Sequence, residues 1–180
     1  MAASNAHGQY TQMEDTRSVV IERSERYSAW TLPSIFPLVG VNGSTELQND
    51  AQSFGAQAVN HLSNKLMIGL FGPSRPFFRL EMGEKMKAVL VESGIPEDQG
   101  QNILQNAEQE SVKELDRMGA REPFTMTLQN LIITGNALLY FPKDKDMEVY
   151  TMRNYVIKRD LAGFPFLMIT KDEKMSNSKY

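Results

Sequence analysis

A helical part of the chain gives way to a strand-rich part in the stretch Leu131-Ile132-Ile133-Thr134-Gly135-Asn136-Ala137-Leu138-Leu139-Tyr140-Phe141-Pro142. The apolar residues before Gly135 continue a pattern that begins at Phe124, and they predict a mostly buried helix. Glycine and asparagine tolerate the backbone conformation that ends helices, so this helix should end near residues 135–136. The apolar run over residues 137–141 then predicts a buried strand, which ends at Pro142 because proline has no amide hydrogen to donate.

The residues after Pro142 predict further strands joined by short turns. Strands are expected over residues 147–152, 154–159 and 164–170, with turns at 143–146 and 160–163. Pro165 restricts the last strand to a sheet edge or delays its start. Upstream of residue 121, apolar spacing predicts helices over residues 10–29, 50–71, 83–93 and 97–118, with a short strand over 76–82. Several helices followed by a small antiparallel sheet are typical of an α+β fold.

Two segments carry apolar side chains that need a partner surface. The connector over residues 31–37 contains two prolines and cannot be a helix interior. Its large apolar side chains must dock on the chain's own core or on a neighbouring chain: Trp30, Leu32, Ile35 and Phe36. The helix over 97–118 has only a thin apolar stripe, made of Leu104, Ala107, Ser111, Leu115 and Met118. Such a helix packs on one side only, or against another subunit.

Composition excludes several kinds of chemistry. The chain has 180 residues, a formal net charge of −3 and no cysteine, and its only histidines are His7 and His61. Disulfides, thiolate nucleophiles and centres built from several histidines are therefore ruled out. No phosphate-binding loop, nucleophile elbow or zinc-protease motif is present. We therefore expect neither an enzyme nor a cofactor, and the short apolar runs argue against a membrane span.

Two weaker patterns leave alternatives open. Asp144, Asp146 and Glu148 alternate and could hold a hard divalent cation, although the lysines between them are typical of a solubilising turn. A small basic patch at a strand end could contact a nucleic-acid backbone, or could be ordinary surface: Arg153, Lys158 and Arg159. The second pattern gives an alternative function, a DNA-binding adaptor module.

Four stretches carry a family resemblance: residues 30–37, 55–71, 131–142, and 155–160 together with 169–172. Together they resemble the N-terminal wing part of the portal protein, or head-to-tail connector, of short-tailed bacteriophages. The block over 131–142 is the most specific of the four. On this basis we expect a flexible arm over residues 1–9, a portal wing-like domain over 10–172 and a polar tail over 173–180.

The resemblance implies a structural role in a virion. Such portals are homo-oligomeric rings, typically dodecamers, at one capsid vertex, and they serve DNA packaging and DNA ejection. Other portal subunits, capsid, tail adaptor and terminase proteins are the implied partners, and assembly would take place in the host cytoplasm. DNA passes through the ring, and direct contact with this part is left open. The candidate subunit contacts are Trp30, Leu32, Ile35, Phe36, Leu104 and Leu115. In this family the stem, clip and crown lie further along a longer chain, so no channel or terminase-contact residue is assigned here.

Overall fold

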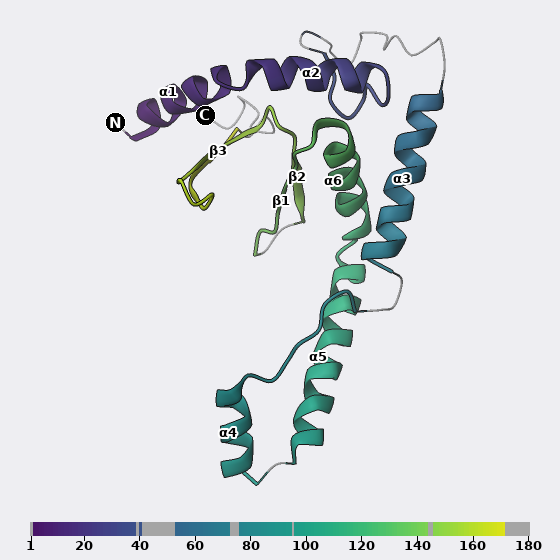
Figure 1. The fold of residues 1–180 in the computed structure, drawn as a ribbon, viewed down its shortest axis with the longest axis vertical. Helices are drawn as coiled ribbons and strands as arrows, with labels where there is room; N and C mark the ends of the chain where they lie inside the picture. Colours follow the sequence, from purple (N-terminus) through teal and green to yellow (C-terminus); the bar gives the residue numbers. More distant parts are fainter. Residues whose placement is uncertain are drawn as a thin grey trace, which may run out of the picture. The chain divides into compact units, whose positions relative to one another are not determined.

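The computed structural model describes residues 2–38, 40, 53–72, 76–94, 96–143 and 146–171, and within these ranges it describes the side chains from residue 6 onward, except that of residue 97. The elements run α1 (Ala2–Asp15), α2 (Ser18–Ala29), α3 (Phe54–Leu70), α4 (Glu84–Glu92), α5 (Glu97–Arg117), α6 (Arg121–Thr134), β1 (Leu138–Tyr140), β2 (Glu148–Tyr150), β3 (Tyr155–Arg159) and β4 (Pro165–Thr170). Figure 1 shows helices first and strands last along the chain. The predicted α+β class is therefore confirmed.

The chain divides into two compact units. The first combines residues 1–63 with residues 123–180, and the second contains residues 64–122. The first unit therefore holds α1, α2 and all four strands, whereas the second holds α4 and α5. The grouping of residues 10–172 as one portal wing-like domain stays a prediction.

The strands form two separate antiparallel pairs in the described part of the chain, where we had expected one small sheet. In the first pair, Leu138 of β1 lies opposite Tyr150 of β2. In the second, Tyr155 of β3 lies opposite Thr170 of β4. A tight turn, in which the amide of Asn154 donates to the carbonyl of Thr151, separates β2 from β3. The chain therefore leaves the first pair before the second begins.

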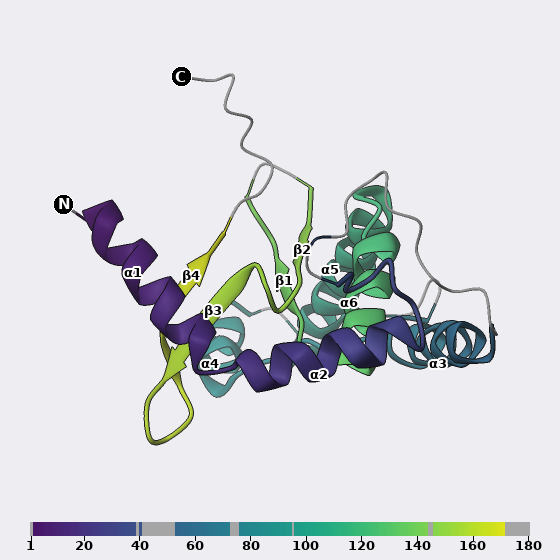
Figure 2. The ribbon, with the colours of Figure 1, turned by 90° about the horizontal axis from the view of Figure 1, so that it is seen from above.

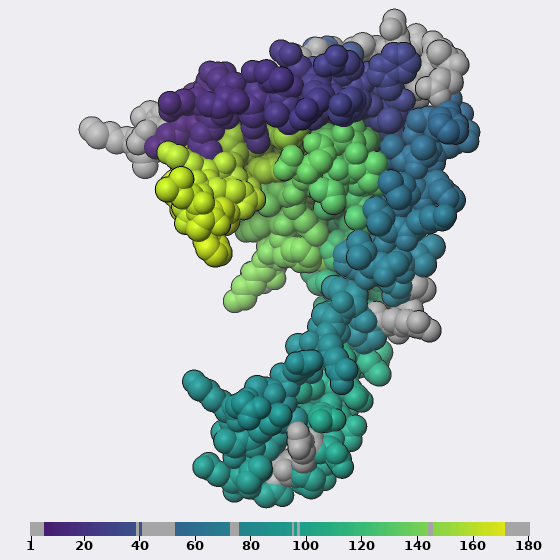
Figure 3. All heavy atoms as spheres, in the orientation of Figure 1, coloured from purple at the N-terminus to yellow at the C-terminus, as the bar shows by residue number. Residues whose placement is uncertain are grey.

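The buried side chains of the first unit include residues of α1, β3 and α6. Val156 of β3 is 1% exposed, and Tyr10 of α1 is buried, with its hydroxyl donating to the carbonyl of Arg153. Figure 2 shows α1 beside β3 and β4, and Figure 3 shows the atoms of the hairpin against those of α1. Phe124 and Ile133 of α6 are buried, as predicted for that helix. The first and last segments of the chain thus stabilise each other.

The N-terminal helices differ from the expectation in two ways. Residues 2–9, expected as a loose arm, belong to α1, and the helix predicted over 10–29 is interrupted between Asp15 and Ser18. Arg17 has a non-helical backbone, with φ −117°. The Thr16 hydroxyl donates to the Met13 carbonyl at 2.8 Å. The Arg17 side chain reaches carbonyls near the start of β3, a long-range bond that no local pattern reveals.

The second unit is built on the hairpin of α4 and α5. Gly100 of α5 lets the two helices approach, because a Cβ there would lie 2.7 Å from Leu90 of α4. The strand expected over residues 76–82 is not a strand. Instead, the amide of Leu80 donates to the carboxylate of Glu108 on α5 at 2.6 Å. Because a side chain accepts the hydrogen bond of this amide, no neighbouring strand is required to pair with it.

The stripe on α5 is also shifted from the one we predicted. Its less exposed residues follow an i, i+4 spacing over Gly100, Leu104, Glu108 and Val112, and then reach Leu115. Ala107, Ser111 and Met118 are exposed, although we had placed them in the stripe. Glu108 takes a buried position because the Leu80 amide compensates its carboxylate, which a pattern that counts only apolar residues overlooks.

Candidate interaction surfaces

The connector after α2 divides its apolar side chains between the interior and the surface. Trp30 is 70% exposed, whereas Leu32 and Ile35 are half-buried. The backbone turns sharply, with the Ile35 amide donating to the Leu32 carbonyl at 3.0 Å. Phe36 is 1% exposed, so it packs inside its own chain and offers no surface to a neighbouring subunit. Our assignment of Phe36 as a subunit contact was therefore wrong, whereas Trp30, Leu32 and Ile35 remain candidates.

Arg153 explains why Phe36 is held inside. Its guanidinium lies 4.3 Å from the centre of the Phe36 ring, donates to the carbonyl of Pro37 and pairs with the carboxylate of Glu25. The side chains of Arg153 and Glu25 are 22% and 16% exposed. A cation that is this deeply engaged is not free to contact a phosphate. Arg153 therefore does not belong to the predicted basic patch. It connects α2, the connector and the segment before β3.

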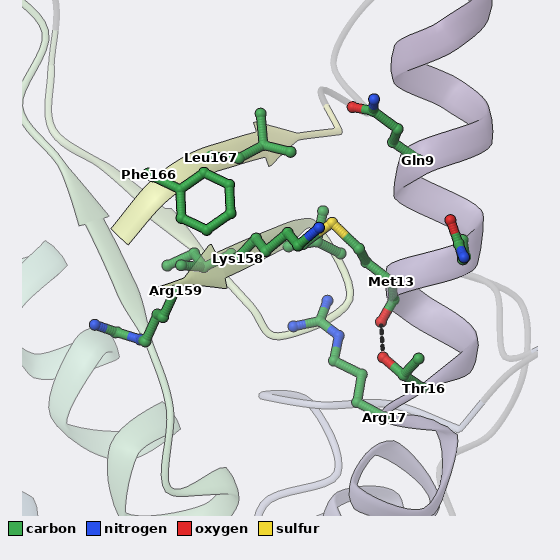
Figure 4. A pocket seen from close by; sticks show the side chains of 11 residues that line it. Gln9, Met13, Thr16, Arg17, Lys158, Arg159, Phe166 and Leu167 are labelled. Atoms are coloured by element: carbon green, nitrogen blue, oxygen red, sulfur yellow. Dashed lines mark hydrogen bonds between the residues drawn. The ribbon is translucent and has the colours of Figure 1, made fainter. Parts of the chain in front are cut away.

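The other two cations of the patch line a cleft between α1 and the β3–β4 hairpin (Figure 4). The cleft has a volume of about 740 Å³ and is lined by both polar and apolar side chains. Lys158 and Arg159 both line the cleft from β3, and in Figure 4 the Lys158 side chain extends toward α1 whereas the Arg159 side chain points away from it. Arg17 replaces Arg153 as the third cation. None of the residues that line the cleft is acidic. The structure thus gathers positive charge here from sequence positions far apart.

Arg17 is both a structural anchor and part of this cleft. Its guanidinium donates to the carbonyl of Met152 at 2.6 Å and also to the carbonyl of Tyr155. It lies 5.7 Å from the centre of the Tyr155 ring. Its buried Nε atom has no hydrogen-bond partner among the described residues. The sequence did not reveal Arg17 as part of a site, because the residues around it have the pattern of one continuous, solvated helix.

The surroundings of Tyr155 change its acidity. Burial raises the pKa of the Tyr155 phenol above its ordinary value of 10.0, while the nearby charges of Arg17 and Arg159 oppose the rise. A raised pKa in the folded state means that the neutral phenol is favoured by folding.

The free energy of unfolding should therefore fall in alkali. The contribution of Tyr155 is fully present below about pH 10 and is lost as the pH rises through the higher pKa of the folded state, because the unfolded chain releases the proton first. Urea denaturation between about pH 9 and 11 measures this change. The free energy of unfolding should fall less steeply with pH in Tyr155→Phe than in the wild type. Tyr27→Phe is the control, since Tyr27 is 52% exposed. Equal slopes for the wild type and Tyr155→Phe would contradict the assignment.

The tip of the β3–β4 hairpin exposes large apolar side chains. Leu161 in the turn is fully exposed, and Phe164, Phe166 and Met168 are 69%, 62% and 50% exposed. Phe164, Phe166 and Met168 alternate at every second residue, and this spacing is visible in the sequence, but it is equally typical of the inward face of a sheet. Large apolar side chains gathered on one hairpin are typical of a surface that contacts another molecule.

The second unit has an apolar surface of its own. In α4 no residue is buried, and Met86, Val89 and Val91 are 54%, 57% and 79% exposed. In α5 the predicted contact residues Leu104 and Leu115 are half-buried, while Ile103 is 62% exposed. Leu104 and Leu115 therefore remain candidate subunit contacts. Ile103 is an additional exposed apolar residue, which lies outside the stripe that the sequence predicted.

The candidate cation site is only partly described. Asp144 lies outside the described residues, Asp146 is exposed, and the Glu148 carboxylate accepts a hydrogen bond from the Tyr150 hydroxyl at 2.6 Å. Within the described ranges, no three His, Cys, Asp or Glu side chains gather as metal ligands would. In that same part of the chain, no helix combines the length and the apolar character that a membrane crossing requires.

The described residues form exposed apolar surfaces and a cleft lined by cations. Both kinds of surface are typical of proteins that bind other molecules. The family described as bacteriophage head to tail connecting protein matches residues 3–168. The chain belongs to this family, and the resemblance inferred from the sequence is confirmed.

Individual relatives agree with this family. The chain is 35% identical over 158 residues to the portal protein of Enterobacteria phage SP6, covering 88% of this chain and 30% of the relative. It is 30% identical over 181 residues to the portal protein of Escherichia phage T7, covering 96% and 33%. For the portal protein of Pseudomonas phage phiKMV the identity is 31% over 147 residues, covering 80% and 28%. The chain thus spans about a third of the length of the curated relatives it matches.

Proposed function

We propose that this chain is the wing-like part of a phage portal subunit and that it acts as a structural component of the head-to-tail connector ring. The match of residues 3–168 to the connector family is the observation that carries the proposal. Relatives named as portal proteins in three different phages support it. The ring would serve DNA packaging into the capsid and DNA ejection, in the virion and during assembly in the host cytoplasm. This part would act by contacting other portal subunits and would catalyse no reaction.

The exposed surfaces indicate how such a part would contribute to a ring. In a ring each subunit uses two different faces, one for each neighbour. The candidate contacts are Trp30, Leu32 and Ile35 in the connector, and Leu104 and Leu115 in α5. Aromatic and aliphatic side chains of this kind make up the buried centre of stable interfaces. Other portal subunits, typically in a dodecamer, would be the main partners, and capsid, tail adaptor and terminase proteins would be the remaining ones.

Self-association tests the proposal. Mass photometry and negative-stain microscopy of the full chain, alone and co-expressed with a full-length portal subunit of this family, should show ring-like particles. Trp30→Ala should shift the mass distribution toward single chains, because Trp30 is 70% exposed and its loss removes contact area without disturbing the core.

Lys113→Ala is the matched control, since Lys113 is an exposed residue in an i, i+3 ion pair with Glu110. This variant should assemble like the wild type. A chain that stays monomeric in both settings, and that never enters a ring with the full-length subunit, would refute the portal role.

A further inference from the structure

Three cations line the cleft between α1 and the β3–β4 hairpin, and no acidic side chain lines it. Lys87, Lys113, Arg117, Arg121 and Arg153 each pair with a carboxylate. Among the described residues, Arg17, Lys158 and Arg159 pair with none. Their charges are therefore not neutralised within the described part of the chain, even though the chain as a whole carries −3.

The partners that these three cations do have are neutral. Arg17 donates to two backbone carbonyls, and Arg159 donates to the Gly163 carbonyl at 2.9 Å. The Lys158 ammonium lies 5.7 Å from the centre of the Phe166 ring. Carbonyls and rings orient a cation without cancelling its charge, so the cleft keeps a positive potential. Asp160, which follows Arg159 in the sequence, accepts the Phe164 amide at 2.8 Å. Neither Asp160 nor Asp15, the acid nearest to Arg17 in the sequence, lines the cleft.

Neutral donors and an aromatic ring complete the cleft. Gln9 and Gln12 of α1 line it and carry amide groups that can donate to phosphate oxygens. Figure 4 shows the Phe166 ring beside the Lys158 side chain, on the hairpin side of the cleft. Phe166 is 62% exposed, so much of its side chain remains accessible to a flat ligand.

We infer that this cleft binds single-stranded nucleic acid, with the cations that line it on the phosphates and Phe166 stacking against a base. A positively charged groove combined with an accessible aromatic side chain is the usual construction of single-strand sites. A duplex keeps its bases stacked on one another, so it would leave Phe166 unused. An acidic protein segment would use the cations but would gain no base stacking. The inference rests on the cleft alone and does not depend on ring assembly.

Fluorescence anisotropy of a labelled oligothymidine of about 12 nucleotides, titrated with the full chain, tests the inference, because such sites span about 4–16 nucleotides. Binding should weaken with salt, with a slope near −2 for about three phosphate contacts. Lys158→Ala combined with Arg159→Ala should weaken binding at least about tenfold and make the salt slope shallower by about 1.4. Phe166→Leu should weaken binding at least about fivefold with little change in the salt slope, because it removes stacking and keeps the charges.

The matched control removes two charges elsewhere. Lys113→Ala combined with Arg117→Ala takes two exposed cations from α5 and should leave affinity and salt slope unchanged. Circular dichroism confirms that each variant is folded before its affinity is compared. No binding of the oligonucleotide would overturn the inference. Equal competition by polyglutamate would indicate a site for an acidic protein segment, and a preference for duplex DNA would likewise overturn the single-strand assignment.

Discussion

Gly55→Ala should lower the free energy of unfolding by about 3 kcal/mol, which corresponds to a fall in melting temperature of roughly 6–12 °C for a chain of this size. Gly55 lies in the first turn of α3, directly against the end of α2. A Cβ at this position would overlap the carbonyl oxygen of Trp30 and lie 3.2 Å from the Cα of Thr31. Both neighbours are backbone atoms, so no side-chain rotation can relieve the overlap, and the helix itself must move.

Gly69→Ala is the matched control for this prediction. Gly69 belongs to the same helix, and nothing lies within 4 Å of a Cβ built there. Alanine in a helix is more stable than glycine by roughly 0.5–1 kcal/mol, so this variant should be slightly more stable than the wild type. Thermal and urea denaturation of both variants measure the difference. A Gly55→Ala variant as stable as Gly69→Ala would show that α3 does not pack against the end of α2 in this way.

Arg153→Met should be the other strongly destabilising change, by about 3 kcal/mol. Methionine keeps most of the apolar stem, so the packing against Phe36 changes little. The variant leaves the Glu25 carboxylate, whose side chain is 16% exposed, without its cation. It also removes the donor to the Pro37 carbonyl. Both groups would stay partly buried without their partners, which costs more than the pair contributes when it is intact.

A double-mutant cycle distinguishes this cause from a loss of packing. In a Glu25→Gln background, Arg153→Met should cost less, because no charge is then left unpaired. Arg117→Met provides the exposed comparison: Arg117 and its partner Glu114 are 79% and 52% exposed, and this change should stay within about 0.5 kcal/mol. Equal costs for Arg153→Met in the two backgrounds would mean that the Glu25 pair does not carry the effect.

Local patterns were sufficient for the order of most elements. The stretch over residues 131–142 correctly placed the end of α6 and the start of β1, because apolar periodicity and the Gly135–Asn136 stop act within a few residues. The strand predictions after Pro142 are confirmed as β2, β3 and β4. The predicted helix start at residue 50 lies outside the described residues, although α3 itself lies within the predicted range.

Long-range bonds account for the elements that were misplaced. Arg17 leaves the helix where its side chain reaches carbonyls more than 130 residues away. Leu80 gives its amide to Glu108 rather than to a strand, and the same bond makes a charged residue part of the buried face of α5. In each case one polar group is satisfied by a partner that is remote in sequence, and no local spacing encodes such a partner.

The cations of the cleft also show what sequence proximity can predict and what only the fold decides. Lys158 and Arg159 were identified from the sequence because they are adjacent cations at the end of a strand. Arg153 was grouped with them because it is close in sequence, yet the fold places it against Phe36 and Glu25. Arg17 joins the cleft from the other side because α1 packs along β3. Proximity in sequence thus grouped two cations that line the cleft with a third that lies elsewhere in the fold.

The amino-acid sequence by itself determined the α+β class, the succession of most helices and strands, and the membership in the connector family. These depend on residue type and short spacing, which act along the chain. The tertiary structure alone decided that Phe36 and Arg153 belong to the interior, and that Arg17 shares a cleft with Lys158 and Arg159. The physical reason is that burial and charge compensation depend on which segments meet in space, and residues far apart in the sequence decide both.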